Sequence, residues 1–146
     1  MSELENPFQE TLLQRHRAQP CTLVIFGATG DLTHRKLIPA LYRRQKAGQF
    51  SEPTRIIGAS RSKLSDQEFQ DFARKALGEF VKPQELEPAE VDRFIGRLSY
   101  VPVDAKSGDG FPALKQAIGD SDRIRVFYLA VGPELFGLIA DKVKEH

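Results

Sequence analysis

The stretch Cys21-Thr-Leu-Val-Ile-Phe-Gly-Ala-Thr-Gly-Asp-Leu32 decides the fold of this chain. Up to Phe26 it is a continuous apolar run of strand-forming residues, which is typical of a strand buried in the middle of a parallel sheet. The turn Gly27-Ala28-Thr29-Gly30 follows, and a segment with helical spacing begins at Asp31. Glycines let the backbone approach a pyrophosphate, and the positive end of the helix dipole attracts it. The stretch therefore predicts a dinucleotide-binding site.

The glycine motif by itself is weakly specific. Its spacing is Gly-x-x-Gly, whereas the usual dinucleotide fingerprint is Gly-x-Gly-x-x-Gly, and a tight turn between strand and helix would explain the four residues alone. The strand before the turn and the helix after it favour the phosphate-binding interpretation. The sequence contains no Gly-x-x-x-x-Gly-Lys-Ser/Thr motif, which excludes a P-loop.

Composition and charge narrow the class of protein. The 146 residues include 40% hydrophobic and 28% charged residues, which suits one globular domain. A net charge of +1 provides no field that would attract nucleic acid or a membrane surface. Cys21 is the only cysteine, so an internal disulfide and a cysteine metal site are excluded, and no metal is expected. Without an apolar run of membrane-spanning length or a signal-peptide pattern, we expect a cytoplasmic protein.

The order of predicted elements indicates the architecture. Residues 1–20 are expected to form an N-terminal arm outside the sheet, and residues 21–146 a dinucleotide-binding domain. We predict four strands, each followed by a helical pattern, at Leu23–Phe26, Thr54–Ala59, Leu98–Val103 and Ile124–Val131. Leu98–Val103 alternates between apolar and polar residues, and Ile124–Val131 is expected to be buried although Arg125 interrupts it. The alternation of strands and helices predicts an α/β fold: part of a doubly wound, mostly parallel Rossmann-type sheet with helices on both faces. Right-handed crossovers give the strand order 3-2-1-4, with the glycine turn at the switch point.

Two features of the predicted helices can be recognised from a few neighbouring residues. Pro39 lies inside the first helix and is expected to bend it, because proline lacks an N–H group and its ring clashes with the preceding turn. Ser65 and Glu68 have the spacing of a capping box that opens the next helix.

The tip of the second strand bears on the choice of cofactor. In dinucleotide folds an acidic residue there binds the 2′-hydroxyl of NAD, whereas an arginine accommodates the 2′-phosphate of NADP. This chain has Ser60-Arg61-Ser62-Lys63 at that place, with no carboxylate. We interpret Arg61 as a phosphate ligand and Lys63 as a solvated side chain. The predicted cofactor is NADP.

No residue is assigned a catalytic role from the pattern. His34 is interpreted as a surface helix residue, and the carboxylate of Asp31 as a cap for free N–H groups in the first helical turn. Oxidation of an alcohol by a nicotinamide needs a base to accept the hydroxyl proton. The sequence therefore predicts a cofactor platform without a complete reaction centre.

Four segments together resemble a known family: Val24–Leu32, Arg35–Tyr42, Ile57–Arg61 and Phe127–Pro133 are similar to the opening of the glucose-6-phosphate dehydrogenases. The string Gly-Asp-Leu-x-x-Arg-Lys-Leu-x-Pro is far more specific than a glycine pair. The resemblance implies the N-terminal coenzyme domain, which binds NADP for oxidation of glucose 6-phosphate to 6-phosphogluconolactone, the first step of the pentose phosphate pathway. It also implies a homo-oligomer in the full enzyme.

The resemblance also implies site residues. Those carried over for NADP are Gly27, Ala28, Thr29, Gly30, Asp31, Leu32, Thr33, Arg61, Asp104, Ala105, Val131, Gly132 and Pro133. In the family, the positions of Asp104 and Ala105 lie near the adenosine, and the turn at residues 131–133 borders the nicotinamide. Gly132 departs from the residue usual there. Lys36 matches a lysine near the reacting centre and is expected to lie close to the sugar phosphate substrate.

The sequence departs from the family pattern in two motifs. The family's Glu-Lys-Pro motif and its Arg-Ile-Asp-His-Tyr segment, which holds the catalytic histidine, have no counterpart in this sequence. We therefore expect the C-terminal catalytic domain to be absent and the chain alone to lack catalysis.

Two alternative functions remain open. One alternative is a short-chain reductase or epimerase, which would use a Tyr-x-x-x-Lys pair that we do not expect here. The other is a non-catalytic nucleotide-sensing or interaction module.

Overall fold

A computed structural model describes residues 21–48, 54–119, 124–130 and 136–145, and the expected N-terminal arm lies outside them. The described strands form one parallel sheet in the order β3-β2-β1-β4, as the sequence predicts. Their bounds are β1 Cys21–Phe26, β2 Arg55–Ser60, β3 Leu98–Pro102 and β4 Ile124–Leu129. The glycine turn therefore leaves β1 between β2 and β4, at the switch point of the sheet.

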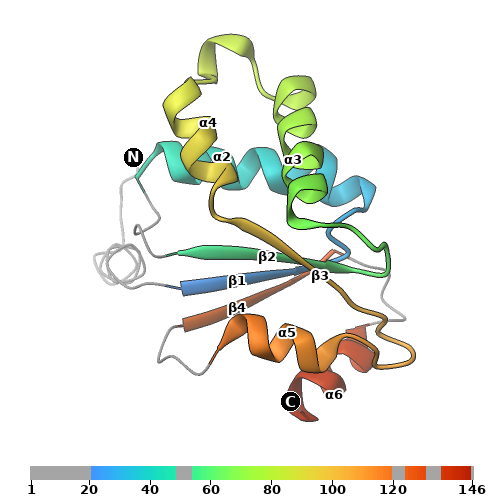
Figure 1. Ribbon diagram of the computed structural model, residues 1–146. Helices are drawn as coiled ribbons and strands as arrows, with labels where there is room; N and C mark the ends of the chain where they lie inside the picture. The colour runs from blue at the N-terminus through green and yellow to red at the C-terminus, as the bar shows by residue number, and fades with distance from the viewer. Residues whose placement is uncertain (1–20, 49–53, 120–123, 131–135, 146) are drawn as a thin grey trace, which may run out of the picture.

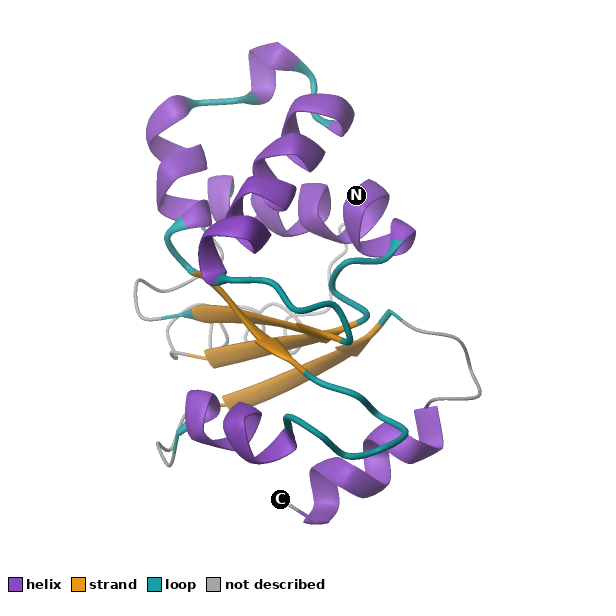
Figure 2. Ribbon diagram, turned by 45° about the vertical axis from the view of Figure 1, so that its right-hand side comes forward, coloured by secondary structure: helices purple, strands orange, loops and turns teal. Residues whose placement is uncertain are grey.

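Helices cover both faces of this sheet (Figure 1). Their bounds are η1 Thr33–Leu37 (a π-helix), α2 Ile38–Lys46, α3 Asp66–Phe80, η2 Pro83–Glu85 (a 3₁₀-helix), α4 Pro88–Ile95, α5 Phe111–Ile118 and α6 Phe136–Glu145. Figure 2 shows α2, α3 and α4 on one side of the strands and α5 and α6 on the other. None of the described helices has the length and apolar character needed to cross a membrane.

The apolar run of β1 supplies both cores. Leu23 and Ile25 pack against the layer of α2, α3 and α4, whereas Val24 and Phe26 point to the other face and contact the α5 and α6 layer. All four side chains are buried. Because successive strand residues face opposite sides, only a strand that is apolar throughout can fill two cores at once.

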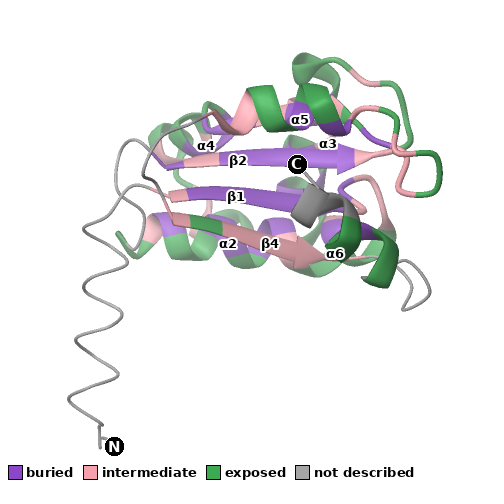
Figure 3. Ribbon diagram, turned by 90° about the horizontal axis from the view of Figure 1, so that it is seen from below, coloured by how far each residue is buried: buried purple, intermediate pink, exposed green. Residues whose placement is uncertain are grey.

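Strand β4 differs from the prediction. It was expected to be buried, but its side chains are half-buried and Arg125 is exposed. In the described sheet β4 pairs with β1 on one side only, and Figure 3 shows it as intermediate beside the buried β1 and β2. An edge strand has less packing around it, so an apolar run alone did not determine its burial.

The first helix also differs in detail. Pro39 lies inside a continuous helical run, as expected, but the residues before it form the π-helix η1 and α2 begins at Ile38, so Pro39 lies in the first turn of α2. At the junction, Ile38 N donates a π-type hydrogen bond to Thr33 O. A π-helical turn contains one residue more than an α-helical turn, so the hydrogen-bond pattern changes directly before the proline, which has no N–H group to donate.

The capping box at the start of α3 is confirmed. Ser65 Oγ accepts a hydrogen bond of 3.1 Å from Glu68 N, and Glu68 Oε1 accepts one of 2.9 Å from Ser65 N. Helix α3 then packs on β2 through Phe69, whose ring lies directly over Gly58. A Cβ atom at Gly58 would lie 2.6 Å from this ring, so the close approach of helix and strand requires glycine.

Candidate functional site

The glycine turn is fixed by hydrogen bonds on both sides. Gly27 has a φ of 80°, a left-handed conformation that glycine adopts without strain. Its N–H group donates to Ala59 O at 2.9 Å, which ties the turn to β2. Its carbonyl accepts from Gly30 N and from Thr33 Oγ1, each at 3.0 Å, which ties it to the following helix. The turn is therefore a rigid link between strand and helix.

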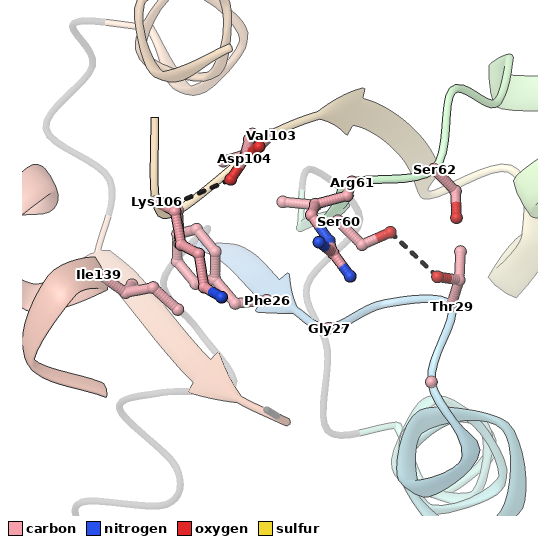
Figure 4. Close-up of a pocket in the computed structure, with 13 residues that line it drawn as sticks. Phe26, Gly27, Thr29, Ser60, Arg61, Ser62, Val103, Asp104, Lys106 and Ile139 are labelled. Carbon is pink, nitrogen blue, oxygen red and sulfur yellow. Dashed lines mark hydrogen bonds between the residues drawn. The ribbon is translucent and has the colours of Figure 1, made fainter. Parts of the chain in front are cut away.

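A cavity of about 630 Å³ opens beside this turn, at the carboxyl ends of β1, β2 and β3. Its volume is in the range of sites for small molecules and cofactors. The predicted residues that line it are Gly27, Thr29, Gly30, Arg61, Asp104 and Ala105. Figure 4 shows Thr29 of the glycine turn, Arg61 at the tip of β2 and Asp104 after β3 around the same space. Three segments that are distant in the sequence thus form one site.

Two cations face this cavity. Arg61 extends into it from the tip of β2, and Lys106 extends into it from the loop after β3 (Figure 4). The Asp104 carboxylate is engaged in shaping that loop, since its Oδ1 accepts hydrogen bonds from Lys106 N at 2.9 Å and Ser107 N at 3.4 Å. The arrangement is suited to binding an anion at the outer end of the cavity.

Lys106 is the residue that sequence reasoning missed. Its signal was available, because the carboxyl ends of parallel strands meet at one edge, so residues after β3 approach those after β2. Ser60 and Ser62 also line the cavity, on either side of Arg61, and Ile139 of α6 reaches it from the far end of the chain. Nothing in the local sequence around Ile139 indicated that position.

Four predicted residues do not line this cavity: Ala28, Asp31, Leu32 and Thr33. Ala28 and Thr33 are buried beneath the turn. Asp31 is exposed, and its Oδ1 lies 3.2 Å from Arg35 Nε, so it forms an ion pair with the next turn of its own helix. These side chains shape the turn or its surroundings, and Asp31 points to solvent.

Lys36 lies at a second, smaller cavity of about 270 Å³ on the β4 side of the turn. The other lining residues come from the first helix and from the end of β4: Leu32, Leu37, Ala40, Tyr128, Leu129 and Ala130. Val131, Gly132 and Pro133 follow Ala130 directly in the sequence and lie outside the described residues. Lys36 and Arg61 therefore belong to separate cavities on the two sides of the glycine turn.

His34 is not the surface residue that was expected. Its side chain is 19% exposed and packs between Phe72 and Phe80, with ring centroids at 4.9 and 5.3 Å. Its Nε2 lies 3.6 Å from Glu79 Oε2. This histidine joins the first helix to α3. The part of the chain that the structure describes contains no group of three or more His, Cys, Asp or Glu residues that could hold a metal ion.

Contrary to the expectation, the chain contains one Tyr-x-x-x-Lys pair, Tyr42 and Lys46. The structure assigns both to packing of α2. The Tyr42 hydroxyl donates to Glu85 O and accepts from Glu87 N, each at 3.0 Å, and Lys46 Nζ donates to Glu85 O at 2.8 Å. Neither residue lines the cavity beside the glycine turn, so the pair does not form the proton-transfer site of a reductase.

The model of a family described as "Glucose-6-phosphate dehydrogenase, NAD binding domain" matches residues 24–146. A glucose-6-phosphate 1-dehydrogenase of Rhizobium meliloti (strain 1021) is 54% identical over 129 residues, which cover 88% of this chain and 26% of the relative. The enzyme of the same name from Gluconobacter oxydans (strain 621H) is 42% identical over 133 residues, with coverage of 89% and 27%.

Solved structures agree with these matches. A structure described as glucose-6-phosphate dehydrogenase in complex with its substrate glucose-6-phosphate superposes with a TM-score of 0.78 at 32% identity, covering 87% of this chain and 27% of the other. The glucose-6-phosphate 1-dehydrogenase from Mycobacterium avium gives a TM-score of 0.78 at 31% identity, with the same coverage. The chain thus spans about a quarter of the length of these relatives.

Proposed function

Because this chain belongs to the glucose-6-phosphate dehydrogenase family and matches that family's NAD-binding domain, we propose that it binds NADP in the cavity beside the glycine turn. In an enzyme of the length of its relatives, the bound cofactor would accept a hydride during oxidation of glucose 6-phosphate to 6-phosphogluconolactone. That reaction is the first step of the pentose phosphate pathway. The residues of this chain would hold and orient the cofactor.

The observation that carries the choice of NADP is the position of Arg61. It lies at the tip of β2 between Ser60 and Ser62, and its side chain extends into the cavity (Figure 4). A carboxylate at this tip would bind the ribose 2′-hydroxyl of NAD and repel a phosphate, whereas a guanidinium pairs with phosphate oxygens. Lys106, from the loop after β3, adds a second positive charge to the same cavity (Figure 4).

The other parts of the cofactor can also be assigned positions around the glycine turn. We assign the pyrophosphate to the turn from Gly27 to Gly30, at the start of the helix, where backbone N–H groups and the helix dipole favour negative charge. The adenosine would lie against Asp104 and Ala105, which line the wall after β3. The nicotinamide would extend over the turn toward the second cavity and residues 131–133.

Lys36 is proposed to serve the substrate side. It lines the second cavity, next to Ala130, whereas Arg61 lines the first. An ammonium group at that position can attract the phosphate or hydroxyl groups of a sugar phosphate. The two ends of the proposed reaction are thus divided between the two cavities, with the glycine turn between them.

The experiment that tests the proposal is a calorimetric titration of the purified 146-residue chain with NADP, NAD and 2′,5′-ADP. We expect NADP to bind at least about tenfold more tightly than NAD, and 2′,5′-ADP to compete with NADP. Equal affinity for NADP and NAD, or no competition by 2′,5′-ADP, would contradict the assignment of Arg61 to a 2′-phosphate. An enzyme that spans the length of the relatives should then reduce NADP with glucose 6-phosphate. If the 146-residue chain binds NADP but the longer enzyme does not reduce it with glucose 6-phosphate, a nucleotide-sensing module would be favoured.

A further inference from the structure

Tyr100 of β3 lies directly behind the loop that carries Arg61. Its ring is buried against Phe69, with centroids 5.4 Å apart, and its backbone N–H group donates to Asp66 Oδ1 at 2.8 Å. Its hydroxyl lies 2.5 Å from Ser60 Oγ, 2.6 Å from Ser62 O and 3.1 Å from Ser60 O. A single hydroxyl therefore contacts the residues on both sides of Arg61.

The phenolic proton can be assigned by counting donors. Ser60 O already accepts a hydrogen bond of 2.8 Å from Val103 N, whereas Ser62 O is a carbonyl oxygen at only 2.6 Å from the phenol. Both carbonyls can only accept, and Ser62 O is the nearer of the two, so the Tyr100 proton is directed to Ser62 O. Ser60 Oγ must then donate to the Tyr100 oxygen.

The same chain of hydroxyl groups reaches the glycine turn. Thr29 Oγ1 lies 3.0 Å from Ser60 Oγ (Figure 4), and because the Ser60 proton is used toward Tyr100, Thr29 donates. The hydrogen bonds run from Thr29 to Ser60, to Tyr100 and on to Ser62 O. They connect the proposed pyrophosphate turn to the loop that carries Arg61.

We propose that Tyr100 is a positioning residue for cofactor choice: its hydroxyl fixes the backbone on both sides of Arg61 and so holds the guanidinium toward a 2′-phosphate. The inference rests on the proposed NADP site. Arg61 is exposed, and a backbone that is already anchored on both sides of it loses less backbone entropy when the phosphate binds. The Tyr100 hydroxyl is protonated at neutral pH with the ordinary pKa of a tyrosine, and burial raises that pKa further.

The test compares Tyr100→Phe with a matched control. Phenylalanine keeps the ring contact with Phe69 and removes only the hydroxyl. Tyr42→Phe is the control, because Tyr42 is also buried and its hydroxyl also bonds to two backbone groups, but outside the cavity. We expect Tyr100→Phe to weaken NADP by about 3- to 10-fold and NAD by less than about twofold, with Tyr42→Phe leaving the ratio of the two affinities unchanged.

A double-mutant cycle with Arg61→Ala makes the test specific. If Tyr100 acts through Arg61, then Tyr100→Phe should have little further effect on NADP affinity once Arg61 is alanine. Additive losses, or equal losses for NADP and NAD, would overturn the proposal and leave Tyr100 a packing residue. Should wild type show no preference for NADP and Arg61→Ala change nothing, the proposed function itself fails, and this inference with it.

A second measurement needs no variant to fold. Nitrogen-15 relaxation of the wild-type chain without cofactor should give backbone order parameters above about 0.8 at Arg61 and Ser62, similar to β2. Values below about 0.6 that rise only when NADP is added would show that the cofactor, not Tyr100, orders the loop, and would overturn the proposal.

Discussion

Thr33 Oγ1 donates a hydrogen bond of 3.0 Å to the carbonyl of Gly27, although six residues separate them. Thr33 is fully buried, and the same carbonyl also accepts from Gly30 N. The first helix thereby holds the glycine turn in place through a buried hydroxyl group that a ligand cannot reach. Thr33 was assigned to the cofactor by family resemblance, and the structure indicates that it acts through the turn.

Thr33→Val is therefore the first prediction. Valine fills the same space but leaves the Gly27 carbonyl with one donor fewer, so we expect a loss of about 1–2 kcal/mol in the free energy of unfolding. A looser turn should weaken NADP and NAD by similar factors. Chemical denaturation and titration with both dinucleotides measure these effects; a loss confined to NADP would mean that Thr33 acts on the 2′-phosphate end.

Arg61→Ala is the second prediction. A charged hydrogen bond to phosphate contributes roughly 1.5–3 kcal/mol, so NADP affinity should fall by about 10- to 150-fold while NAD affinity stays nearly unchanged. Lys63→Ala is the matched control, since Lys63 is exposed, two residues away and outside the cavity lining. Should the two variants weaken NADP equally, general positive charge rather than a specific contact would be the cause.

Gly30→Val is the third prediction. A Cβ atom at Gly30 would lie 3.2 Å from Gly27 O, which is already tight, and the branched methyl groups would occupy the space proposed for the pyrophosphate. Binding of both NADP and NAD should be lost while the helical circular dichroism signal is largely kept.

The control for this variant is Gly78→Ala in α3, where a Cβ atom meets nothing within 4 Å. Alanine in a helix interior should stabilise the chain by about 0.5–1 kcal/mol relative to glycine and leave cofactor affinity unchanged. A Gly30→Val chain that binds either dinucleotide with wild-type affinity would remove the pyrophosphate from this turn.

The parts of the molecule that could be predicted from the sequence have local signals. The apolar run of β1, the glycine turn and the Ser65–Glu68 capping box are each contained within a few residues. Strand order follows from the handedness of crossovers once the alternation of strands and helices is recognised. The position of Arg61 at the tip of β2 follows from the same alternation.

The features that could not be predicted depend on contacts between distant segments. His34 is half-buried because Phe72 and Phe80 of α3 pack against it, and nothing near His34 in the sequence specifies these two residues. Tyr100 reaches the Ser60–Ser62 loop because β3 pairs with β2 in a register that aligns Tyr100 with Gly58. Strand register and the packing of distant residues against a side chain depend on the whole fold, so local sequence patterns do not reveal them.

The last prediction concerns the stability of the chain at high pH. Burial raises the pKa of Tyr100 above the ordinary tyrosine value of 10.0, so the folded chain holds the phenolic proton more tightly than the unfolded chain. The folded state then binds more protons than the unfolded state as pH rises above 10, and the free energy of unfolding must fall over that range. Below pH 10 the contribution of Tyr100 is constant.

Lysines and the other tyrosines also titrate at high pH, so the measurement is a difference between two proteins. We expect the loss of stability between pH 9 and pH 11, measured by urea denaturation, to be smaller in Tyr100→Phe than in wild type. Parallel stability curves for the two proteins across this range would show that Tyr100 has the same proton affinity folded and unfolded. The hydroxyl would then lack the buried hydrogen-bonded position on which the anchoring of Arg61 depends.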